Sequence, residues 1–235
     1  MRPERAAGLL GLGLASAWCA PAAAPVVPPL AGLFGIALRL PARRGIALTF
    51  DDGPHPQGTP AVLAELARAG VSATFYLVGE QVERRPALAA EIVAAGHEIA
   101  VHGYRHRLLL RRSVRALRED FDRAAETIGM ATGRDGRSYR PPYGVFSLAG
   151  LGLARRRWEP LLWSRWGRDW EAAATSLTIA ARATRDISAG EVVLLHDADF
   201  YSSADSWRRT ALALPSVIDA ALATGEPLVT VSQSM

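Results

Sequence analysis

The residues best suited to chemistry in this sequence are two adjacent carboxylates and two closely spaced histidines. Asp51 and Asp52 end the apolar run 46–50, where a buried carboxylate requires a cation or a hydrogen-bond donor. His102 and His106 lie four residues apart, so a helical turn between them would bring both imidazoles onto one ion. Two histidines and one carboxylate leave positions open for water and a substrate oxygen, while the second carboxylate stays free as a base. For the histidine pair alone, two surface histidines are the simpler alternative.

The elements that must position these residues alternate between short apolar strands and longer helix-like segments. Strands are expected over residues 46–50, 73–78, 97–101, a short stretch that reaches Tyr139, 161–163, 192–195 and 228–231. Helices are expected over residues 59–69, 86–95, 113–128, 176–186 and 206–223. This order predicts an α/β fold in which parallel strands are joined by crossover helices.

The unusual polar residues follow the carboxyl ends of these strands. In chain order they are Asp51 with Asp52, His102 with His106, Arg140, and His196. In a parallel barrel or sheet the carboxyl ends share one face, and active sites of such folds are assembled there. Residues that are distant in the sequence are therefore expected to meet at one pocket.

Several segments resemble the signatures of polysaccharide deacetylases, the carbohydrate esterases related to the rhizobial nodulation-factor deacetylase. Residues 49–54, Thr-Phe-Asp-Asp-Gly-Pro, resemble the first signature. Residues 102–106 are similar to the metal-binding signature, although Gly103 replaces the usual Ser or Thr. Residues 140–144 resemble the third signature and residues 194–196 the fifth. The resemblance runs from about residue 46 to residue 231 and implies a distorted (β/α) barrel of about seven parallel strands in a single domain.

The resemblance also implies a role for each matching residue. The general base would be Asp51, paired with Arg140, and the general acid would be His196. A divalent metal, for which the ligand set favours zinc, would bind to Asp52, His102 and His106. The oxyanion and the acetyl group of the substrate would be contacted by Pro141, Tyr143 through its backbone amide, Trp170 and Leu194.

The fourth signature departs from the family pattern. Residues 163–170 resemble the tryptophan-to-Asp-Trp stretch, but Trp166 occupies the place of its first aspartate, which orients the acid histidine. Without another carboxylate in reach, the pKa of His196 is expected to fall. The candidate replacements, which the sequence does not separate, are Asp169, Asp197 and Asp199. Asp169 as a surface cap and Trp170 as core packing are the simpler alternatives.

Four further residues stand near these signatures without a matching role. Tyr201 and Trp207 either stack on a sugar face or pack in the interior. His55 follows the first signature, and His97 is expected to be a strand-edge or core histidine.

The composition indicates one folded domain after an N-terminal extension. The chain has 235 residues, of which 49% are hydrophobic, and shows no composition break within the expected domain. Its net charge of +4 comes mainly from arginines in helix-like segments, as on a solvated face. Attraction to an anionic cell wall or lipid surface is the second explanation, and no nucleic-acid partner is expected. With Cys19 as the single cysteine, no disulfide forms within the chain.

Residues 1–40 are expected to be a signal peptide or membrane anchor with a Pro-rich linker. Arg2 and Arg5 precede the apolar run 6–17, and its Ala-Ser-Ala end predicts cleavage after Ala17. An uncleaved anchor with membrane association is the alternative, although the run is shorter than the about 20 residues of a membrane span. In both cases the catalytic domain, residues 41–235, is expected outside the cytoplasm, secreted or membrane-anchored.

The implied activity is removal of N-acetyl groups from N-acetylglucosamine-type sugars. The glycan partner would be a polysaccharide, peptidoglycan or a glycolipid, and fold analogy does not choose among them. One alternative is a metal hydrolase of another carbon–nitrogen amide. The other is an inactive domain that binds glycans. The presence of both Asp51 and His196 opposes the inactive domain, whereas the altered fourth signature favours it. The sequence carries no signal for an oligomeric state.

Overall fold

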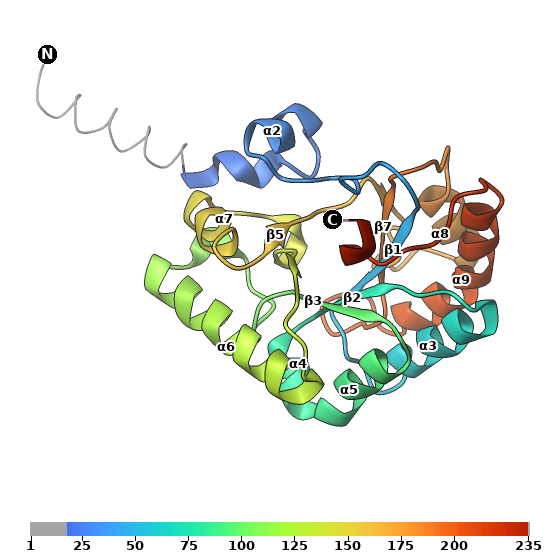
Figure 1. Ribbon diagram of the computed structural model, residues 1–235, viewed down its shortest axis with the longest axis horizontal. Helices are drawn as coiled ribbons and strands as arrows, with labels where there is room; N and C mark the ends of the chain where they lie inside the picture. The colour runs from blue at the N-terminus through green and yellow to red at the C-terminus, as the bar shows by residue number, and fades with distance from the viewer. Residues whose placement is uncertain (1–17, 235) are drawn as a thin grey trace, which may run out of the picture.

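The computed structural model describes residues 18–234, which form a curved parallel sheet with helices around it (Figure 1). In this part of the chain seven strands pair in the order β5-β4-β3-β2-β1-β7-β6, and all neighbouring pairs are parallel. The strands are β1 Ala47–Asp51, β2 Thr74–Leu77, β3 Glu98–Val101, β4 Ser138–Tyr139, β5 Glu159–Pro160, β6 Arg165–Trp166 and β7 Val192–His196. The distorted barrel of about seven parallel strands in a single domain is therefore confirmed.

The α-helices cover the outside of the sheet. They are α2 Pro28–Leu33, α3 Gly58–Ala69, α4 Gly79–Arg84, α5 Pro86–Ala94, α6 Val114–Thr132, α7 Leu148–Ala154, α8 Ser176–Ala183 and α9 Ser206–Leu222. Short 3₁₀ turns are η1 Ala20–Ala23, η2 Leu109–Arg111, η3 Pro142–Gly144 and η4 Ser232–Ser234. Gly70 ends α3 in the left-handed conformation, with φ of 67°, as expected for a helix C-terminal glycine.

The central strands are buried on both faces, because helices cover the outside and side chains fill the inside. All five residues of β1 and all four residues of β2 are buried. Their apolar runs are nearly continuous, which is typical of parallel sheets. Phe50 and Phe75, which are register partners on β1 and β2, stack with ring centroids 5.1 Å apart. This rigid centre fixes where the carboxyl ends of the strands lie.

Residues 18–40 pack against the barrel. Ala31, Ile36 and Leu40 are buried in the hydrophobic core. Ala37 donates its amide to the carbonyl of Pro160 and accepts the amide of Leu162, forming an isolated parallel bridge beside β5. Among the helices that the structure describes, none has the length and apolar composition to cross a membrane. The predicted signal or anchor, residues 1–17, lies outside the described residues.

Some expected elements are displaced or absent. The strand expected over 161–163 falls between β5 and β6, because the carbonyls of Leu161 and Leu162 accept hydrogen bonds from the Arg140 side chain. The strand expected over 228–231 is reduced to one bridge between Ile46 and Leu228. Helices α2, α4 and α7 were not expected from the sequence, and α6 extends four residues beyond the predicted end, to Thr132. The helical turn expected between His102 and His106 is a loop instead.

Candidate active site

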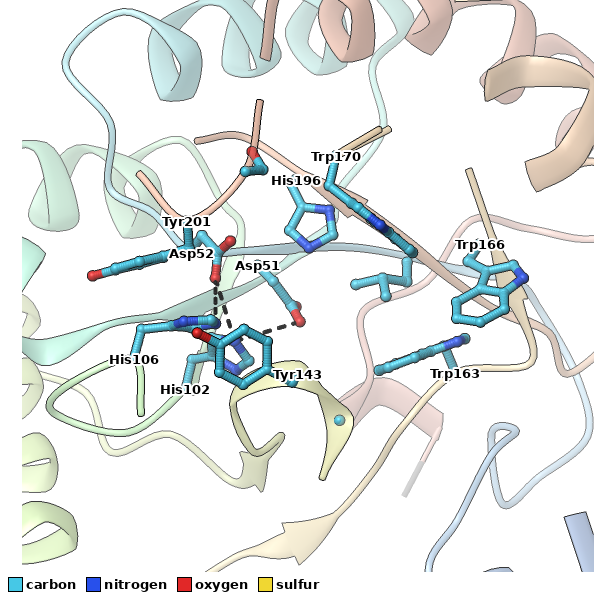
Figure 2. Close-up of a pocket in the computed structure, with 13 residues that line it drawn as sticks. Asp51, Asp52, His102, His106, Tyr143, Trp163, Trp166, Trp170, His196 and Tyr201 are labelled. Carbon is cyan, nitrogen blue, oxygen red and sulfur yellow. Dashed lines mark ion pairs between the residues drawn. The ribbon is translucent and has the colours of Figure 1, made fainter. Parts of the chain in front are cut away.

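A cavity of about 320 Å³ lies at the carboxyl ends of the strands (Figure 2). It collects residues from β1, β6, β7 and the loops that follow β3, β4 and β7. The residues that line it are Asp51, Asp52, His102, His106, Tyr143, Gly144, Trp163, Trp166, Trp170, Leu194, His196, Tyr201 and Ser202. The convergence expected from the strand order thus occurs within one cavity.

Asp52, His102 and His106 have the geometry of a metal site. Their candidate ligand atoms all lie within 4.8 Å of one another. Asp52 Oδ1 is 3.4 Å from His102 Nε2 and 3.3 Å from His106 Nε2. Asp52 Oδ1 is also buried and has no hydrogen-bond partner among the described residues. A buried carboxylate oxygen without a donor is costly, so the arrangement fits a cation held by the three side chains.

The hydrogen bond of His102 supports the same interpretation. His102 Nδ1 lies 2.8 Å from the carbonyl oxygen of Arg140. Because a carbonyl oxygen only accepts, Nδ1 carries the proton and donates it. In the neutral ring the lone pair is then on Nε2, which faces the Asp52 carboxylate. A cation between these two atoms would turn a repulsive contact into two bonds to one ion.

Burial controls the charge of one of the two groups that face His102 and is outweighed at the other. Burial lowers the pKa of His106 to about 4, against the opposing effect of the Asp52 charge, so this histidine is neutral near pH 7. Burial alone would raise the pKa of Asp52. The contact with His102 and the positive charge of His196 are the largest opposing effects, and together with smaller effects of the histidine pair they lower that pKa to about 2. A neutral imidazole and an ionised carboxylate are the forms that bind a metal.

Asp51 is held apart from this set by Arg140. Arg140 is fully buried and donates from Nη1 to Asp51 Oδ1 at 2.6 Å and to Thr49 Oγ1 at 2.9 Å. The other oxygen, Asp51 Oδ2, lies 3.8 Å from His102 Nε2 and borders the cavity. Asp51 therefore has one oxygen fixed by an ion pair and one free to act on a ligand.

His196 lies beside Asp51, because the two are register partners on β7 and β1. Its Nδ1 lies 2.9 Å from Asp169 Oδ1, and Asp169 Oδ2 accepts the His196 backbone amide at 2.7 Å and the Thr210 hydroxyl at 2.7 Å. Burial alone would lower the pKa of His196. The charge and hydrogen bond of Asp169, supported by the charges of Asp52 and Asp51, raise that pKa to about 10. His196 is therefore protonated near pH 7.

The partner of His196 corrects the expectation drawn from the fourth signature. Asp169 holds the imidazole, so the tryptophan at position 166 does not leave His196 without a carboxylate. The other two candidates are used elsewhere: Asp197 accepts the Thr59 hydroxyl, and Asp199 Oδ1 lies 3.3 Å from His55 Nε2. Burial raises the pKa of Asp197 to about 7. The pKa of His196 is raised, not lowered as it would be without a partner.

Tyr143 follows Arg140 in a tight turn at the mouth of the cavity. Its φ of 61° is in the left-handed region, which is uncommon for a non-glycine residue. Gly144 and Val145 donate their amides to the carbonyls of Pro141 and Pro142 at 2.8 and 3.3 Å, and no such backbone bond is seen for the Tyr143 amide within the described residues. Pro141 is buried and is not among the described residues that line the cavity.

Tryptophans and a leucine form the apolar wall opposite the histidine pair. The ring centroids of Trp163 and Trp166 are 5.7 Å apart, those of Trp166 and Trp170 are 5.6 Å apart, and Trp170 lies edge-on to His196 at 5.4 Å. Leu194 completes this wall. Trp170 thus borders the cavity as well as packing on its neighbours. A small apolar group such as a methyl would fit here.

The structure shows the positions of several residues whose role the sequence left open or did not indicate. Tyr201 lines the cavity and stacks on His106, whereas Trp207 is buried against His55. His97 is buried beside Phe75, outside the cavity. Thr210 was not anticipated, because its contact with Asp169 joins residues 41 positions apart.

Comparisons with known proteins agree with this geometry. The family model described as "Polysaccharide deacetylase" matches residues 40–156. A chitooligosaccharide deacetylase of Sinorhizobium fredii is 37% identical over 161 residues, covering 65% of this chain and 71% of that protein. A peptidoglycan-N-acetylglucosamine deacetylase of Bacillus cereus is 31% identical over 192 residues, covering 80% of this chain and 86% of that protein. The crystal structure of the peptidoglycan N-acetylglucosamine deacetylase Bc1960 has a TM-score of 0.79 at 27% identity, covering 87% and 94% of the two chains.

Proposed function

Because the chain belongs to the polysaccharide deacetylase family, we propose that it is a divalent-metal-dependent hydrolase that removes N-acetyl groups from polymers of N-acetylglucosamine. The observation that carries this proposal is the cavity itself. Within it three side chains that could hold a metal, the carboxylate of Asp51 and a histidine whose pKa is raised meet against an apolar wall. Relatives that match over 71% and 86% of their own length are named as chitooligosaccharide and peptidoglycan deacetylases, which supports a substrate of this class.

We propose that Asp52, His102 and His106 hold the metal, and zinc suits two imidazoles and one carboxylate. The bound ion would act as a Lewis acid toward the acetyl carbonyl and toward water. The hydrogen bond from His102 Nδ1 to the Arg140 carbonyl orients that ring and leaves Nε2 free to bind.

Asp51 is the proposed general base. Arg140 fixes Asp51 Oδ1 at 2.6 Å, which leaves Oδ2 to take the proton of the water that attacks the acetyl carbonyl. The buried Arg140 guanidinium holds this carboxylate in place. The Tyr143 backbone amide is the proposed donor to the oxyanion, and such a donor typically contributes about 3–4 kcal/mol in the transition state.

His196 is the proposed general acid. Asp169 accepts from Nδ1, so Nε2 is the atom available to give a proton to the departing sugar amine. The acid and the base lie on adjacent strands and face the cavity together, as Figure 2 shows. The apolar wall of Trp170 and Leu194 would surround the acetyl methyl group.

The arrangement favours an enzyme over an inactive glycan-binding domain. A domain that only binds glycans has no use for a buried Asp51–Arg140 pair beside a histidine whose pKa is raised. Hydrolysis of another carbon–nitrogen amide uses the same groups, so only substrate tests separate it. We also propose that the domain acts outside the cytoplasm, secreted or membrane-anchored, because the leader-like composition of residues 1–17 precedes it.

The test is acetate release from purified protein on chitin oligomers, peptidoglycan, exopolysaccharide and an N-acetylglucosaminyl lipid, with and without a chelator. We expect release that the chelator abolishes and that Zn²⁺ restores. Asp51→Asn should lower turnover about 10²–10⁴-fold while metal content stays close to wild type, because Asp51 acts on water. His106→Ala should lower metal content.

Two results would contradict these assignments. Acetate release that is unaffected by the chelator would remove the metal from the proposal. Loss of metal together with turnover in Asp51→Asn would reverse the roles given to Asp51 and Asp52, and unchanged metal binding in His106→Ala would remove His106 from the ligand set.

A further inference from the structure

Tyr201 makes the closest ring contact of the candidate metal site. Its ring stacks on His106 with centroids 4.1 Å apart and an interplanar angle of 12°. The Tyr143 ring approaches His106 edge-on from another side, at 4.5 Å and 66°. Figure 2 shows the Tyr201 and His106 rings lying parallel at the edge of the cavity. His106 is therefore confined by two aromatic rings.

This confinement matters because His106 lacks the anchor that His102 has. A histidine that binds a metal is ordinarily fixed by a hydrogen bond from its other ring nitrogen. His102 Nδ1 makes that bond to the Arg140 carbonyl. His106 Nδ1 is buried and has no hydrogen-bond partner among the described residues. His106 also lies in a loop, where no helix restricts its orientation.

Tyr201 is itself held in place by two hydrogen bonds to its hydroxyl group. Its hydroxyl donates to Glu80 Oε1 at 2.9 Å and accepts from Gln81 Nε2 at 3.0 Å. Both partners belong to α4. Because these two hydrogen bonds fix the orientation of the Tyr201 ring, the stacked Tyr201 ring can restrict the orientation of the His106 ring.

Helix α4 is in turn bonded to the loop that carries His106. The amides of Gly79 and Glu80 donate to the carbonyls of Gly103 and Tyr104 at 2.9 and 2.8 Å. A Cβ atom at Gly79 would lie 2.7 Å from the Tyr104 ring, so the helix and the loop are in close contact. Tyr201 therefore contacts His106 directly and is also bonded to α4, which is bonded to the loop that carries His106.

We propose that Tyr201 is a positioning residue for His106, with its stacked and anchored ring replacing the missing hydrogen bond. The proposal rests on the metal-ligand role given to His106 in the proposed function. It assigns to the loop after β7 a part in metal binding. The Tyr201 side chain connects the loop after β7 with the loop after β3, which carries His106.

The test measures Zn²⁺ affinity by chelator competition, without any substrate. Tyr201→Ala should weaken binding by about 10–100-fold, the range found when a supporting residue of a metal ligand is lost. Tyr201→Leu fills much of the same volume without a ring and should lose affinity similarly. Tyr201→Phe retains the stack and should stay closer to wild type. Phe200→Leu is the matched control, because Phe200 lies in the same loop and packs on His55 and edge-on against Tyr201 at 6.2 Å, while no ring contact between Phe200 and His106 is seen among the described residues.

A second measurement follows the His106 ring by NMR in the metal-free protein. Its ring proton signals should move in Tyr201→Ala and Tyr201→Leu, because the ring current of the stacked tyrosine is removed, and should not move in Phe200→Leu. Thermal unfolding of the metal-free variants separates a local effect from a loss of fold. Wild-type Zn²⁺ affinity in both Tyr201→Ala and Tyr201→Leu would overturn the proposal, as would an equal loss in Phe200→Leu. Failure of acetate release on every glycan would overturn only the proposed function.

Discussion

The largest effect that raises the pKa of His196 comes from a carboxylate that lies 27 residues away in the sequence. Asp169 is fully buried, and each of its oxygens is engaged: Oδ1 by His196 Nδ1, and Oδ2 by the His196 amide and the Thr210 hydroxyl. The Asp169 carboxylate is thus held close to the imidazole, where it raises the pKa of His196 and opposes the lowering by burial. A general acid must be protonated to act, so this contact sets the upper pH limit of the reaction.

We therefore predict that Asp169→Asn moves the alkaline limb of the pH–activity profile to lower pH. Removing the carboxylate charge leaves burial opposed only by the smaller effects of Asp52 and Asp51, so the pKa of His196 falls and the histidine loses its proton at lower pH than in wild type. A shift of about 1–3 pH units is expected for loss of a close opposite charge. The profile of kcat/KM for acetate release measures it.

Trp166→Asp is the control for this prediction. Trp166 packs between Trp163 and Trp170, and Trp170 is the ring that contacts His196. Because Asp169 already accepts a hydrogen bond from His196, a new carboxylate at position 166 should leave the alkaline limb of the pH–activity profile almost unchanged. A large upward shift in Trp166→Asp, or none in Asp169→Asn, would show that Asp169 does not control the acid.

For single residues, the sequence predicts a position in the site only for side chains at or just after the end of a strand. The meeting of Asp51, His102 and His196 follows from the shared edge of parallel strands, and the structure brings them together. The choice of Asp169 over Asp197 and Asp199 depends on how loops return to the sheet. The stack of Tyr201 on His106 depends on two loops almost a hundred residues apart, and no local pattern indicates it.

Among the elements of the barrel, Arg140 connects the end of β4 with β1 and with the segment that follows β5, although β4 and β1 are not neighbours in the sheet. From the end of β4 its guanidinium reaches Thr49 and Asp51 on β1 and the carbonyls of Leu161 and Leu162. It also lies over the Tyr76 ring, 3.9 Å from its centroid. A planar group with several fixed donors is needed to serve these acceptors at once.

We predict that Arg140→Lys lowers both stability and turnover. The ammonium keeps the charge but cannot reach both Asp51 and the two carbonyls, which leaves buried acceptors without donors. Breaking a buried pair of this kind typically costs about 3–5 kcal/mol, and the retained charge places the expected loss at the lower end, about 3 kcal/mol. The free energy of unfolding in denaturant measures the stability, and acetate release measures the turnover.

Arg157→Lys is the matched comparison for this change. Arg157 pairs with Asp122 at 2.7 Å, but 48% and 61% of the two side chains are exposed. Exposed pairs contribute little, so the free energy of unfolding should change by less than about 0.5 kcal/mol. Equal effects of the two substitutions would mean that the buried network of Arg140 does not support the barrel.

The elements themselves were predictable where the apolar pattern was long. Strand β1 and helices α3, α5 and α9 lie within a residue or two of their expected bounds. All of β1 is buried, so its apolar run is unbroken, whereas the helices bury only some of their residues and are long enough for an apolar pattern to indicate them. The two-residue strands β5 and β6 flank the expected strand at 161–163, because that stretch gives its carbonyls to Arg140. Helix α4 is too short for a periodic pattern to indicate it.

For the molecule as a whole, the position of residues 18–40 affects both stability and processing. Ala24, Ala31, Ile36 and Leu40 are buried in the same core as the strands of the barrel. Removing buried aliphatic side chains of the size of Ile36 and Leu40 typically costs about 2–5 kcal/mol each. Natural domains have only about 5–15 kcal/mol of stability in total. The segment is therefore expected to be required for a stable fold.

We predict that a chain starting at Trp18 keeps the stability of the folded domain, whereas a chain starting at Pro41 unfolds or is strongly destabilised. Cleavage after Ala17, as the leader composition predicts, would leave the packed segment 18–40 intact. Thermal unfolding of the two truncated proteins tests the packing, and fractionation with N-terminal sequencing of the full-length product tests the processing. A stable protein starting at Pro41 would contradict the role given to the segment. A cytoplasmic product that retains Met1 would contradict export, and the two results are independent because the first concerns residues 18–40 and the second residues 1–17.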